Sequence, residues 1–497
     1  MEQSSPSAAL SFGLSKSRIA AYERCPRRLW LLVHRPDRAE ADGAADVRLA
    51  ESRYAGIIAR TLLEGKLVVT ETGLATAEAQ TRELIAAKTA AIFEATISHD
   101  GVLIQADILE HQPDDSWRLI EVKSSTSAKD EHIADVATQL WVLRQSGFEI
   151  SGAIVRHVNN AFVLAEGGAH EGLFADVDVM ARAAPISDAR GQVIKFARET
   201  LGGSEPTTAM GKHCDQPATC EFHSHCTAQA PPGPEWSVSV LPRGGGNAWL
   251  KKGILDLLKV PGDGLTNPVH VIVHRATVTG EPHHDVQGAC GAVAAWAYPR
   301  AWLDFETIAF AVPRWVGTRP YEQIPFQFSC HLEQEDGSLA HVDFLSLDGS
   351  DPRRPCAEAL IRLVPASGAV VAYNAPFERS CIIRLAEAFP DLRGALEDLA
   401  SRVVDLLPVT RDAWYHRDQR GSWSIKAVLP TIAADLCYDD LAVGDGNAAQ
   451  AAYVEAISPD TLPERREGIA TALREYCARD TLAMIVVCRH LCGQPRP

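Results

Sequence analysis

The alternation of apolar and polar residues in the first half of the chain predicts two strands followed by a helix. The run GVLIQADILE (101–110) alternates loosely and is rich in β-branched residues, so it predicts a strand that ends near Asp107. The polar turn HQPDDS leads into a second strand, WRLIEVKSS, and the two runs are typical of a hairpin. The stretch that follows is helical in pattern and contains Gln139.

Longer apolar runs in the second half predict buried strands and helices. AWLDFETIAF (301–310) predicts a strand, and GAVVAYNAPFERSCIIRLAEAF predicts a buried strand that runs into a helix. Near the end of the chain, REYCARDTLAMIVVCRHL predicts an amphipathic helix.

The length and the turn residues predict the domain organisation. A chain of 497 residues is long enough for two to four domains. Prolines and a glycine cluster in APPGPEWS (230–237), and LPRGGGNAWLKKG (241–253) predicts a further loop. We expect a disordered N-terminus (1–10), a front domain (11–229), a linker and connecting unit (230–295) and a back domain (296–497).

The predicted hairpin carries groups that suit a divalent metal ion. Glu121 and Lys123 are two apart on one strand and share a face, and Asp107 on the neighbouring strand can converge with them. Carboxylates are the hard oxygen ligands that Mg²⁺ prefers, and a lysine can orient an attacking water. Gln139 can reach the same pocket. The alternative is an exposed hairpin with a surface ion pair between Glu121 and Lys123.

A second set of acids lies in the back half. Asp304 and Glu306 are two apart and share one strand face, and Glu378 lies at the predicted strand–helix junction. Tyr476 and Asp480 are four apart, hence on one helix face. Acids from separate elements suit two metal ions that clamp the attacking and leaving oxygens, and the tyrosine hydroxyl can position a water. Each piece alone is common, but their order within one stretch of domain size favours a site.

The order Asp107, Glu121-x-Lys123 and Gln139 resembles the PD-(D/E)XK nucleases, specifically the RecB-like branch that includes the exonucleases of CRISPR adaptation. The resemblance implies a restriction-endonuclease-like core. Members add a ligand from a helix before the hairpin, for which Glu51 in LAESRYAG is the candidate. The candidate metal ligands of this half are Glu51, Asp107, Glu121 and Val122.

The same branch often holds an iron–sulfur cluster on one early cysteine and three late ones. SRIAAYERCPRR and KHCDQPATCEFHSHC supply such a set, namely Cys25, Cys214, Cys220 and Cys226. One departure from the family concerns Leu143, which stands where members carry a tyrosine four residues after the glutamine. That accessory contact is therefore not expected here.

Cysteine chemistry supports metal binding at this set. Twelve cysteines without a signal peptide or a long apolar span predict a cytoplasmic protein with reduced thiols, not a disulfide framework. Four thiolates suit a [4Fe–4S] cluster, which would staple distant parts of the chain together. A Zn²⁺ site with a histidine ligand is the alternative, because three histidines stand among the cysteines: His213, His223 and His225. The eight other cysteines mostly read as small buried hydrophobes.

The back half resembles the DEDD exonucleases of the DnaQ-like, RNase H-like fold, in the subclass with a tyrosine in its last motif. Its motifs match, in order, Asp304-x-Glu306, Asn374-x-x-Phe377-Glu378 and Tyr476-x-x-x-Asp480. Ser424-Ile425-Lys426 also resembles a stretch of this superfamily. The second motif normally ends in aspartate, and a carboxylate misplaced by about 1 Å can cost about 10²-fold in rate. The whole chain resembles an uncharacterised bacterial family that joins these two halves, in which glutamate is the usual residue.

The net charge of −16 is unusual for a protein that binds nucleic acid, because such binding relies on lysine and arginine. The stretch from Ser15 to Arg38 is nevertheless basic, and it predicts either an entrance for a strand or a solvated helix face. Its basic residues are Lys16, Arg18, Arg24, Arg27, Arg28, Arg35 and Arg38. DAWYHRDQRGSW presents Trp414, Tyr415 and His416, which can stack on bases or pack against their own domain.

These resemblances imply an α/β protein with a restriction-endonuclease-like core and an RNase H-like, mixed-sheet domain. The expected reaction is Mg²⁺- or Mn²⁺-dependent hydrolysis of phosphodiester bonds, in DNA, in single strands or at ends. The candidate catalytic residues are Asp107, Glu121, Lys123, Gln139, Asp304, Glu306, Glu378, Tyr476 and Asp480. One alternative keeps a single active site, and another is a nucleic-acid-binding scaffold in a multiprotein defence or repair complex. A third alternative is an electron-transfer protein, but apart from the cysteine set the sequence has no feature that resembles a redox or flavin site. No membrane partner is expected.

Overall fold

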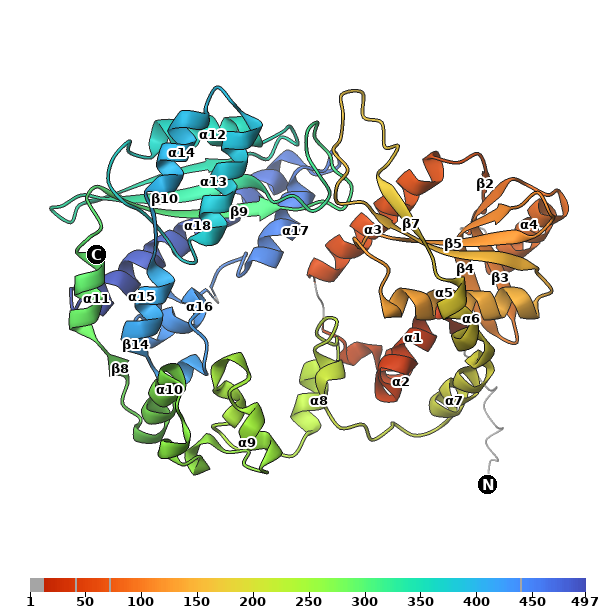
Figure 1. Ribbon diagram of the computed structural model, residues 1–497, viewed down its shortest axis with the longest axis horizontal. Coiled ribbons are helices and arrows are strands. Elements are labelled where there is room, and N and C mark those ends of the chain that lie inside the picture. Colours follow the sequence, from red (N-terminus) through yellow and green to blue (C-terminus); the bar gives the residue numbers. More distant parts are fainter. Residues whose placement is uncertain (1–12, 41–42, 71–72, 439) are drawn as a thin grey trace. The chain divides into compact units, whose positions relative to one another are not determined.

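The chain forms two compact units in this computed structural model, which describes residues 13–40, 43–70, 73–438 and 440–497 (Figure 1). The first unit comprises Met1–Ala230 and Phe310–Tyr321, and the second comprises Pro231–Ala309 and Glu322–Pro497. The predicted disorder of residues 1–10 lies outside the described residues. The first unit ends at Ala230, the first residue of the stretch 230–237, and the rest of the predicted segment 230–295 groups with the second unit. Within the described residues, no helix combines the length and apolarity that a membrane crossing requires.

The first unit is built on a mixed seven-stranded sheet. Its order is β2-β3-β4-β5-β6-β7, with β1 paired to β4, and only the pairs β1–β4, β2–β3 and β5–β6 are parallel. The strands are β1 (Leu14–Ser15), β2 (Lys66–Leu67), β3 (Ala91–His99), β4 (Val102–His111), β5 (Trp117–Lys123), β6 (Ile150–Val158) and β7 (Phe174–Asp178).

The predicted hairpin is present as β4 and β5, which pair antiparallel from Ile108 opposite Ile120 to His111 opposite Trp117. The first strand does not end near Asp107 but continues to His111, because its last four residues form this ladder. The hairpin therefore places Asp107 inside a strand, next to the residues of β5.

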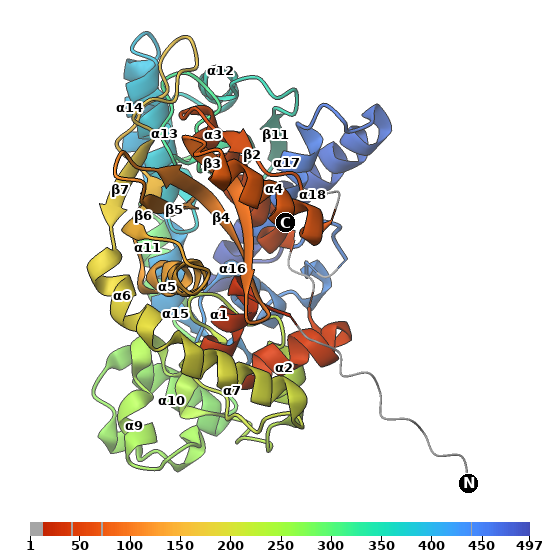
Figure 2. The same ribbon diagram turned by 90° about the vertical axis from the view of Figure 1, so that its right-hand side faces the viewer.

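Helix α5 (Asp130–Gln145) lies against the sheet of the first unit and buries Ile133, Val136, Leu140 and Leu143 (Figures 1 and 2). Leu143, where the resembling family has a tyrosine, is thus a core residue. The other helices of this unit are α1 (Lys16–Arg24), α2 (Pro26–His34), α3 (Gly43–Thr61), α4 (Leu74–Ala86), α6 (Met180–Asp188), α7 (Arg190–Gly202) and α8 (His223–Gln229).

The second unit contains a mixed five-stranded sheet with β9 at its centre. The order is β11-β10-β9-β12-β13, antiparallel among the first three strands and parallel from β9 to β13. Both faces of β9 are covered, so its acids Asp304 and Glu306 lie among buried apolar residues such as Trp302, Leu303 and Phe305. The strands are β9 (Arg300–Ile308), β10 (Ile324–Glu333), β11 (Leu339–Leu345), β12 (Val370–Ala372) and β13 (Val403–Asp405).

Helices pack on this sheet and around it. A shared core joins α12 (Arg353–Leu363), α13 (Pro376–Ala388) and α14 (Arg393–Ser401) to β9, through residues such as Leu360, Ile382 and Leu303. The last helix, α18 (Pro463–Leu491), is not simply amphipathic as predicted. Its residues 483–488 are all buried, so this part of the helix is enclosed on every side. The remaining helices are α15 (Leu406–Ala413), α16 (Ile425–Val428) and α17 (Gly446–Ala456).

The predicted connecting unit forms part of the second unit. The stretch 241–253 is not entirely a loop, because it includes the short helix α9 (Asn247–Lys251). It is followed by α10 (Pro268–Thr279) and α11 (Val286–Val293). Strand β8 (His283–His284) pairs with β14 (Trp414–Tyr415), which buries Trp414 and Tyr415. These two rings therefore pack within their own unit and are not available to stack on bases. The His416 side chain accepts a hydrogen bond from the Asp418 backbone N–H and so caps the turn that follows it.

Candidate metal centres

The acids predicted in the back half come together in the second unit. Asp304 and Glu306 project from one face of β9, and Asp480 projects from α18. Each offers an oxygen, and these three oxygens lie within 4.8 Å of one another. Glu306 and Asp480 are both buried. Three carboxylates at this separation form a candidate site for a divalent cation.

Glu378 joins this cluster from the first turn of α13, at the end of β12. The junction is set by Asn374, which has a left-handed backbone (φ 75°) and donates its N–H to Asp405 Oδ1 over 3.0 Å. Glu378 is 3 % exposed and lines the same cavity as Asp304 and Asp480. Within the described residues its buried Oε2 has no hydrogen-bond partner. A buried carboxylate oxygen without a partner is costly unless a ligand completes it, so the donor set fits a metal ion.

Burial and mutual repulsion raise the pKa values of these acids. Burial raises the pKa of Glu306 to about 8, with Asp480 adding to the effect, and burial likewise raises the pKa of Glu378 to about 8. The pKa of Asp304 is well above its usual value because it is buried beside Asp480. A divalent cation among these groups would favour their charged forms.

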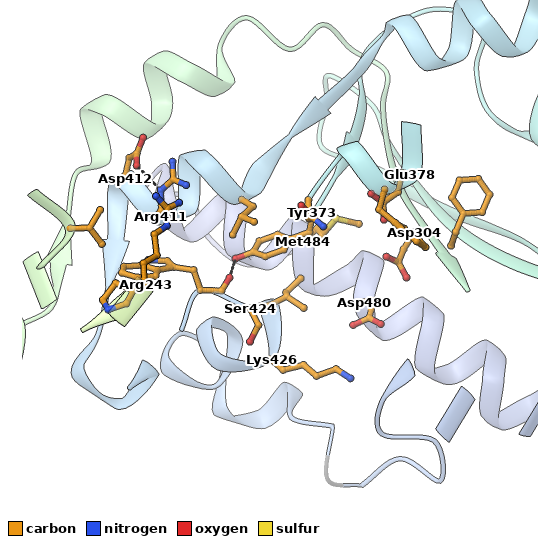
Figure 3. A pocket seen from close by; sticks show the side chains of 18 of the residues that line it. Arg243, Asp304, Tyr373, Glu378, Arg411, Asp412, Ser424, Lys426, Asp480 and Met484 are labelled. Carbon is orange, nitrogen blue, oxygen red and sulfur yellow. Dashed lines mark hydrogen bonds and ion pairs between the residues drawn. The ribbon is translucent and has the colours of Figure 1, made fainter. Parts of the chain in front are cut away.

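Two tyrosines and one lysine surround Asp480. Tyr438 donates to Asp480 Oδ1 over 2.5 Å, and Lys426 donates to Tyr476 Oη over 3.1 Å and to the Gly444 carbonyl over 2.7 Å. The Lys426 ammonium also lies over the rings of both tyrosines. Figure 3 shows Lys426 and Asp480 on the same side of the cavity. Tyr476 therefore faces the acidic cluster, as predicted from its spacing to Asp480.

Tyr438 was not predicted from the sequence. It lies outside regular helices and strands, 42 residues before Asp480, so no helical or strand spacing connects the two. Lys426 belonged to the stretch Ser424-Ile425-Lys426 that resembles the exonuclease superfamily, but its contact with Tyr476 could not be derived from that stretch.

The predicted front-half residues also converge, around Glu121. Gln139 donates to Glu121 Oε2 over 2.6 Å, and Lys123 lies 2.8 Å from Oε1. Asp107 Oδ2 accepts the N–H of Val122 over 2.7 Å, so the Val122 contribution seen here is its backbone amide. Burial and the neighbouring charge of Glu121 raise the pKa of Asp107 to about 7.

Sequence reasoning missed two partners of this group. Lys16, the first residue of α1, donates to Glu121 Oε1 over 2.6 Å, and Asp135 accepts from Lys123 over 2.7 Å. Burial alone would raise the pKa of Glu121, but Lys16 and Lys123 hold it below its usual range. Asp135 stands four residues before Gln139 on α5, a spacing that could have pointed to it.

Glu51 does not join this group in the structure. Its carboxylate accepts hydrogen bonds from the Ala311 amide (3.1 Å) and from Arg314 (2.8 Å), so it ties the segment Phe310–Tyr321 into the first unit. The acid nearer to the group is Glu94 of β3, which binds Arg60 over 2.9 Å and whose pKa is raised by burial.

The four predicted cysteines line one small cavity of the first unit. Cys25 stands at the start of α2, and the Cys220 amide donates to the Cys214 carbonyl over 2.7 Å. Burial raises the pKa of Cys220, and burial with the neighbouring Cys25 and Cys214 raises that of Cys226. His213 and His223 line the same cavity, so the donor set suits either a cluster or Zn²⁺.

The basic stretch of the N-terminal helices is largely engaged by its own unit. Arg24 donates to the His213 carbonyl over 2.7 Å, Arg27 pairs with Glu205, and Arg28 pairs with Glu221. These arginines brace the cysteine segment, and Lys16 serves Glu121, so the stretch is not an unpaired patch for a nucleic-acid strand. Of the eight other cysteines, the buried ones are Cys330, Cys356, Cys381, Cys477 and Cys488, while Cys290, Cys437 and Cys492 are half-buried.

A family model matches part of the chain. Residues 301–424, which include Asp304, Glu306 and Glu378, match a family described as a domain of unknown function (DUF2779). No curated protein and no solved structure matches the chain.

Proposed function

We propose that the protein is a metal-dependent nuclease whose best supported active site lies in the second unit. The observation that carries the proposal is the convergence of Asp304, Glu306 and Asp480, with three ligand oxygens within 4.8 Å of one another. The partnerless Oε2 of Glu378 beside them is a further ligand atom. The mixed sheet that supports these acids agrees with the resemblance to the DnaQ-like, RNase H-like exonucleases.

The residues of this site take distinct parts in the proposed reaction. Asp304, Glu306, Glu378 and Asp480 would hold Mg²⁺ or Mn²⁺, which supply Lewis acidity toward phosphate and water when bound. Tyr476, fixed through its hydroxyl by Lys426, would align the attacking water. Tyr438 holds the Asp480 carboxylate in place through its hydrogen bond to Oδ1.

The front half is proposed as a second, RecB-like nuclease site in which Asp107 and Glu121 hold the metal and Lys123 activates water. Its geometry contains an obstacle. Lys16 and Lys123 both contact Glu121 Oε1, so a metal ion at this oxygen would compete with two ammonium groups. This observation favours the variant of the proposal in which only the second unit cleaves and the first unit binds nucleic acid, as a scaffold would.

The cysteine cavity is proposed to hold a [4Fe–4S] cluster that staples the start of α2 to α8 and to the segment before α8. Four cysteines lining one cavity support this proposal, and the histidines keep Zn²⁺ as the alternative. Iron, sulfide and zinc contents of anaerobically purified protein separate the two. Cys220→Ser should lower the bound metal, whereas Cys356→Ser, at a buried cysteine elsewhere, should leave it unchanged.

Nuclease activity on labelled single- and double-stranded DNA and RNA with Mn²⁺ tests the proposed function. Parent, Lys123→Ala, Asp304→Ala and the double variant are compared. Activity that is lost in stages would establish two working sites, and full loss in Asp304→Ala alone would assign cleavage to the second unit. A parent protein that keeps its cluster, binds nucleic acid and cleaves nothing would overturn the nuclease proposal in favour of a scaffold.

A further inference from the structure

One cavity of the second unit joins two regions of opposite charge. It has a volume of about 880 Å³ and is lined by the acids Asp304 and Asp480 as well as by Arg243 and Arg411. Figure 3 shows the acids gathered at one end and the two arginines together at the other. The proposed nuclease site accounts for the acidic end but assigns nothing to the basic end.

The two arginines are available to an anionic ligand. Within the described residues, the side chain of Arg243 has no hydrogen-bond or ion-pair partner, and the residue is exposed. Arg411, on α15, touches Asp412 at 3.2 Å, but Asp412 is 71 % exposed. Exposed ion pairs of this kind contribute little, so the Arg411 guanidinium can exchange Asp412 for a phosphate, which it can bind with two parallel hydrogen bonds.

The wall between the two ends is aromatic. Tyr373 donates to the Trp423 carbonyl over 2.6 Å, and Trp423 donates its ring N–H to the Trp414 carbonyl over 2.8 Å. Both residues line the cavity with their polar atoms already bonded to the protein. The remaining surface of such rings suits the faces of bases and sugars. The cavity thus offers, in order, a metal-binding end, an apolar wall and a cationic end.

We propose that Arg243 and Arg411 bind a backbone phosphate of a single-stranded nucleic-acid end while the acids act on a neighbouring phosphodiester. This inference rests on the proposed nuclease function and names its substrate class. The alternation of phosphate, nucleoside and phosphate in a strand matches the order of groups along the cavity. Arg243 comes from the segment 230–295, which therefore contributes to substrate binding in addition to connecting the halves.

The size of the cavity favours an unpaired strand over a double helix. A volume of about 880 Å³ lies within the range of pockets that take a single small organic ligand, about 300–1,000 Å³. That is room for one or two nucleotides, whereas the major groove of B-DNA alone is about 12 Å wide. A cavity of this size therefore suits an unpaired strand end at the acids.

Binding to the full-length protein tests the inference without any cleavage. Fluorescence anisotropy with a labelled single-stranded oligothymidylate in Ca²⁺ compares the parent with Arg243→Gln, Arg411→Gln and the double variant. Each substitution should weaken binding about tenfold and lower the salt-dependence slope by about one, and Arg411→Lys should keep much of the affinity. The matched control is Arg362→Gln, at an exposed arginine of α12 outside the cavity, which should bind like the parent.

A second probe locates the phosphate. In oligonucleotides with one neutral methylphosphonate, a single position near one end should weaken binding to the parent but not to the double variant. Arginine variants that bind as tightly as the parent would overturn this inference without touching the nuclease proposal. So would a methylphosphonate effect on binding that is the same in the parent and in the double variant. A parent that binds as expected but cleaves nothing with Mn²⁺ would instead overturn the nuclease function. Parallel RNA oligonucleotides show which sugar the cavity prefers.

Discussion

Tyr438 donates its phenolic hydrogen to Asp480 Oδ1 over 2.5 Å, from a position 42 residues earlier in the chain. The same carboxylate supplies one of three oxygens, from Asp304, Glu306 and Asp480, that lie within 4.8 Å of one another. A carboxylate fixed in this way needs no reorientation when it takes up a cation, so Tyr438 prepares the site without itself being a ligand.

Tyr438→Phe should weaken Mn²⁺ binding at the second-unit site and slow cleavage, each by about 10- to 100-fold, because an outer partner of a metal ligand is lost. Calorimetric titration with Mn²⁺ measures the first effect. Tyr415→Phe is the matched control, since its buried hydroxyl accepts a hydrogen bond from the Gly421 amide away from the acids. Both variants should lose about 0.5–1.5 kcal/mol of stability. Equal Mn²⁺ affinity in the two variants would remove Tyr438 from the site.

Glu378→Gln should separate metal binding from folding. Burial raises the pKa of Glu378 to about 8, so at pH 7 the metal-free protein holds this residue mostly neutral, and glutamine imitates that form. We expect the free energy of unfolding without metal to change by less than about 1 kcal/mol. Cleavage should fall by about 10²-fold or more, because the amide cannot supply a charged ligand. Denaturant unfolding and Mn²⁺-dependent cleavage of the same preparation provide the two readings.

Glu378→Asp tests whether the site is built for the longer side chain. The shorter carboxylate would sit about one bond further from Asp304 and Asp480, and a shift near 1 Å can cost about 10²-fold in rate. An aspartate variant faster than the parent would instead mean that glutamate weakens the site.

The elements that carry the candidate sites could be predicted because their signals are local. The hairpin of β4 and β5 follows from β-branched runs around a polar turn, and β9 follows from an apolar run covered on both faces. Residues on one such element, like Glu121 and Lys123, share a face by strand geometry alone, so their meeting could be expected from spacing.

Contacts between distant elements could not be predicted in this way. Lys16 and Glu121 are 105 residues apart, and their meeting depends on how α1 packs against α5 and β4. In the sequence, Lys16 counts only as one of several basic residues near the N-terminus. The prediction that Glu51 is a metal ligand was wrong for the same reason. Its partner Arg314 belongs to the segment Phe310–Tyr321, which groups with the first unit although it follows residue 230 in the sequence.

The stability of the metal-free protein should fall as the pH rises from about 6.5 to 8. The folded-state pKa values of Glu306 and Glu378 are raised to about 8 from an ordinary value of 4.5. A raised pKa means that stability is present at low pH and is lost as the pH rises through the folded-state value. Bound Mn²⁺ offsets the cost of ionising these buried carboxylates. The rise in melting temperature caused by Mn²⁺ should therefore become larger as the pH increases from about 6.5 to 8.

The lower limit of that interval is set by two histidines. Burial lowers the pKa of His331 and of His490 to about 4, so their contribution is present above about 6.5 and is lost as the pH falls toward 4. Thermal unfolding with and without Mn²⁺, at pH values between about 6.5 and 8, therefore avoids the titration of these two histidines. Glu378→Gln should reduce the pH dependence, and a Mn²⁺ effect that stays constant with pH would contradict the assignment.

Lys16→Met tests whether the first unit binds metal at all. Lys16 lies 2.6 Å from Glu121 Oε1, and the Glu121 side chain is only 2 % exposed, so the substitution leaves a buried carboxylate with less compensation. The metal-free variant should lose about 1–3 kcal/mol of stability, less than a fully buried pair would because Lys16 is partly exposed. Lys88→Met is the control, since the exposed pair Lys88–Asp115 should contribute almost nothing.

Divalent metal should then restore the stability that the Lys16 substitution removes. With the ammonium gone, Glu121 Oε1 keeps Lys123 as a partner and gains room for a cation that Asp107 can share. The melting temperature of Lys16→Met should therefore rise more with Mn²⁺ than that of the parent, measured in an Asp304→Ala background to silence the second unit. An equal rise in both proteins would mean that Glu121 is neutralised by lysine alone, and cleavage would then belong to the second unit.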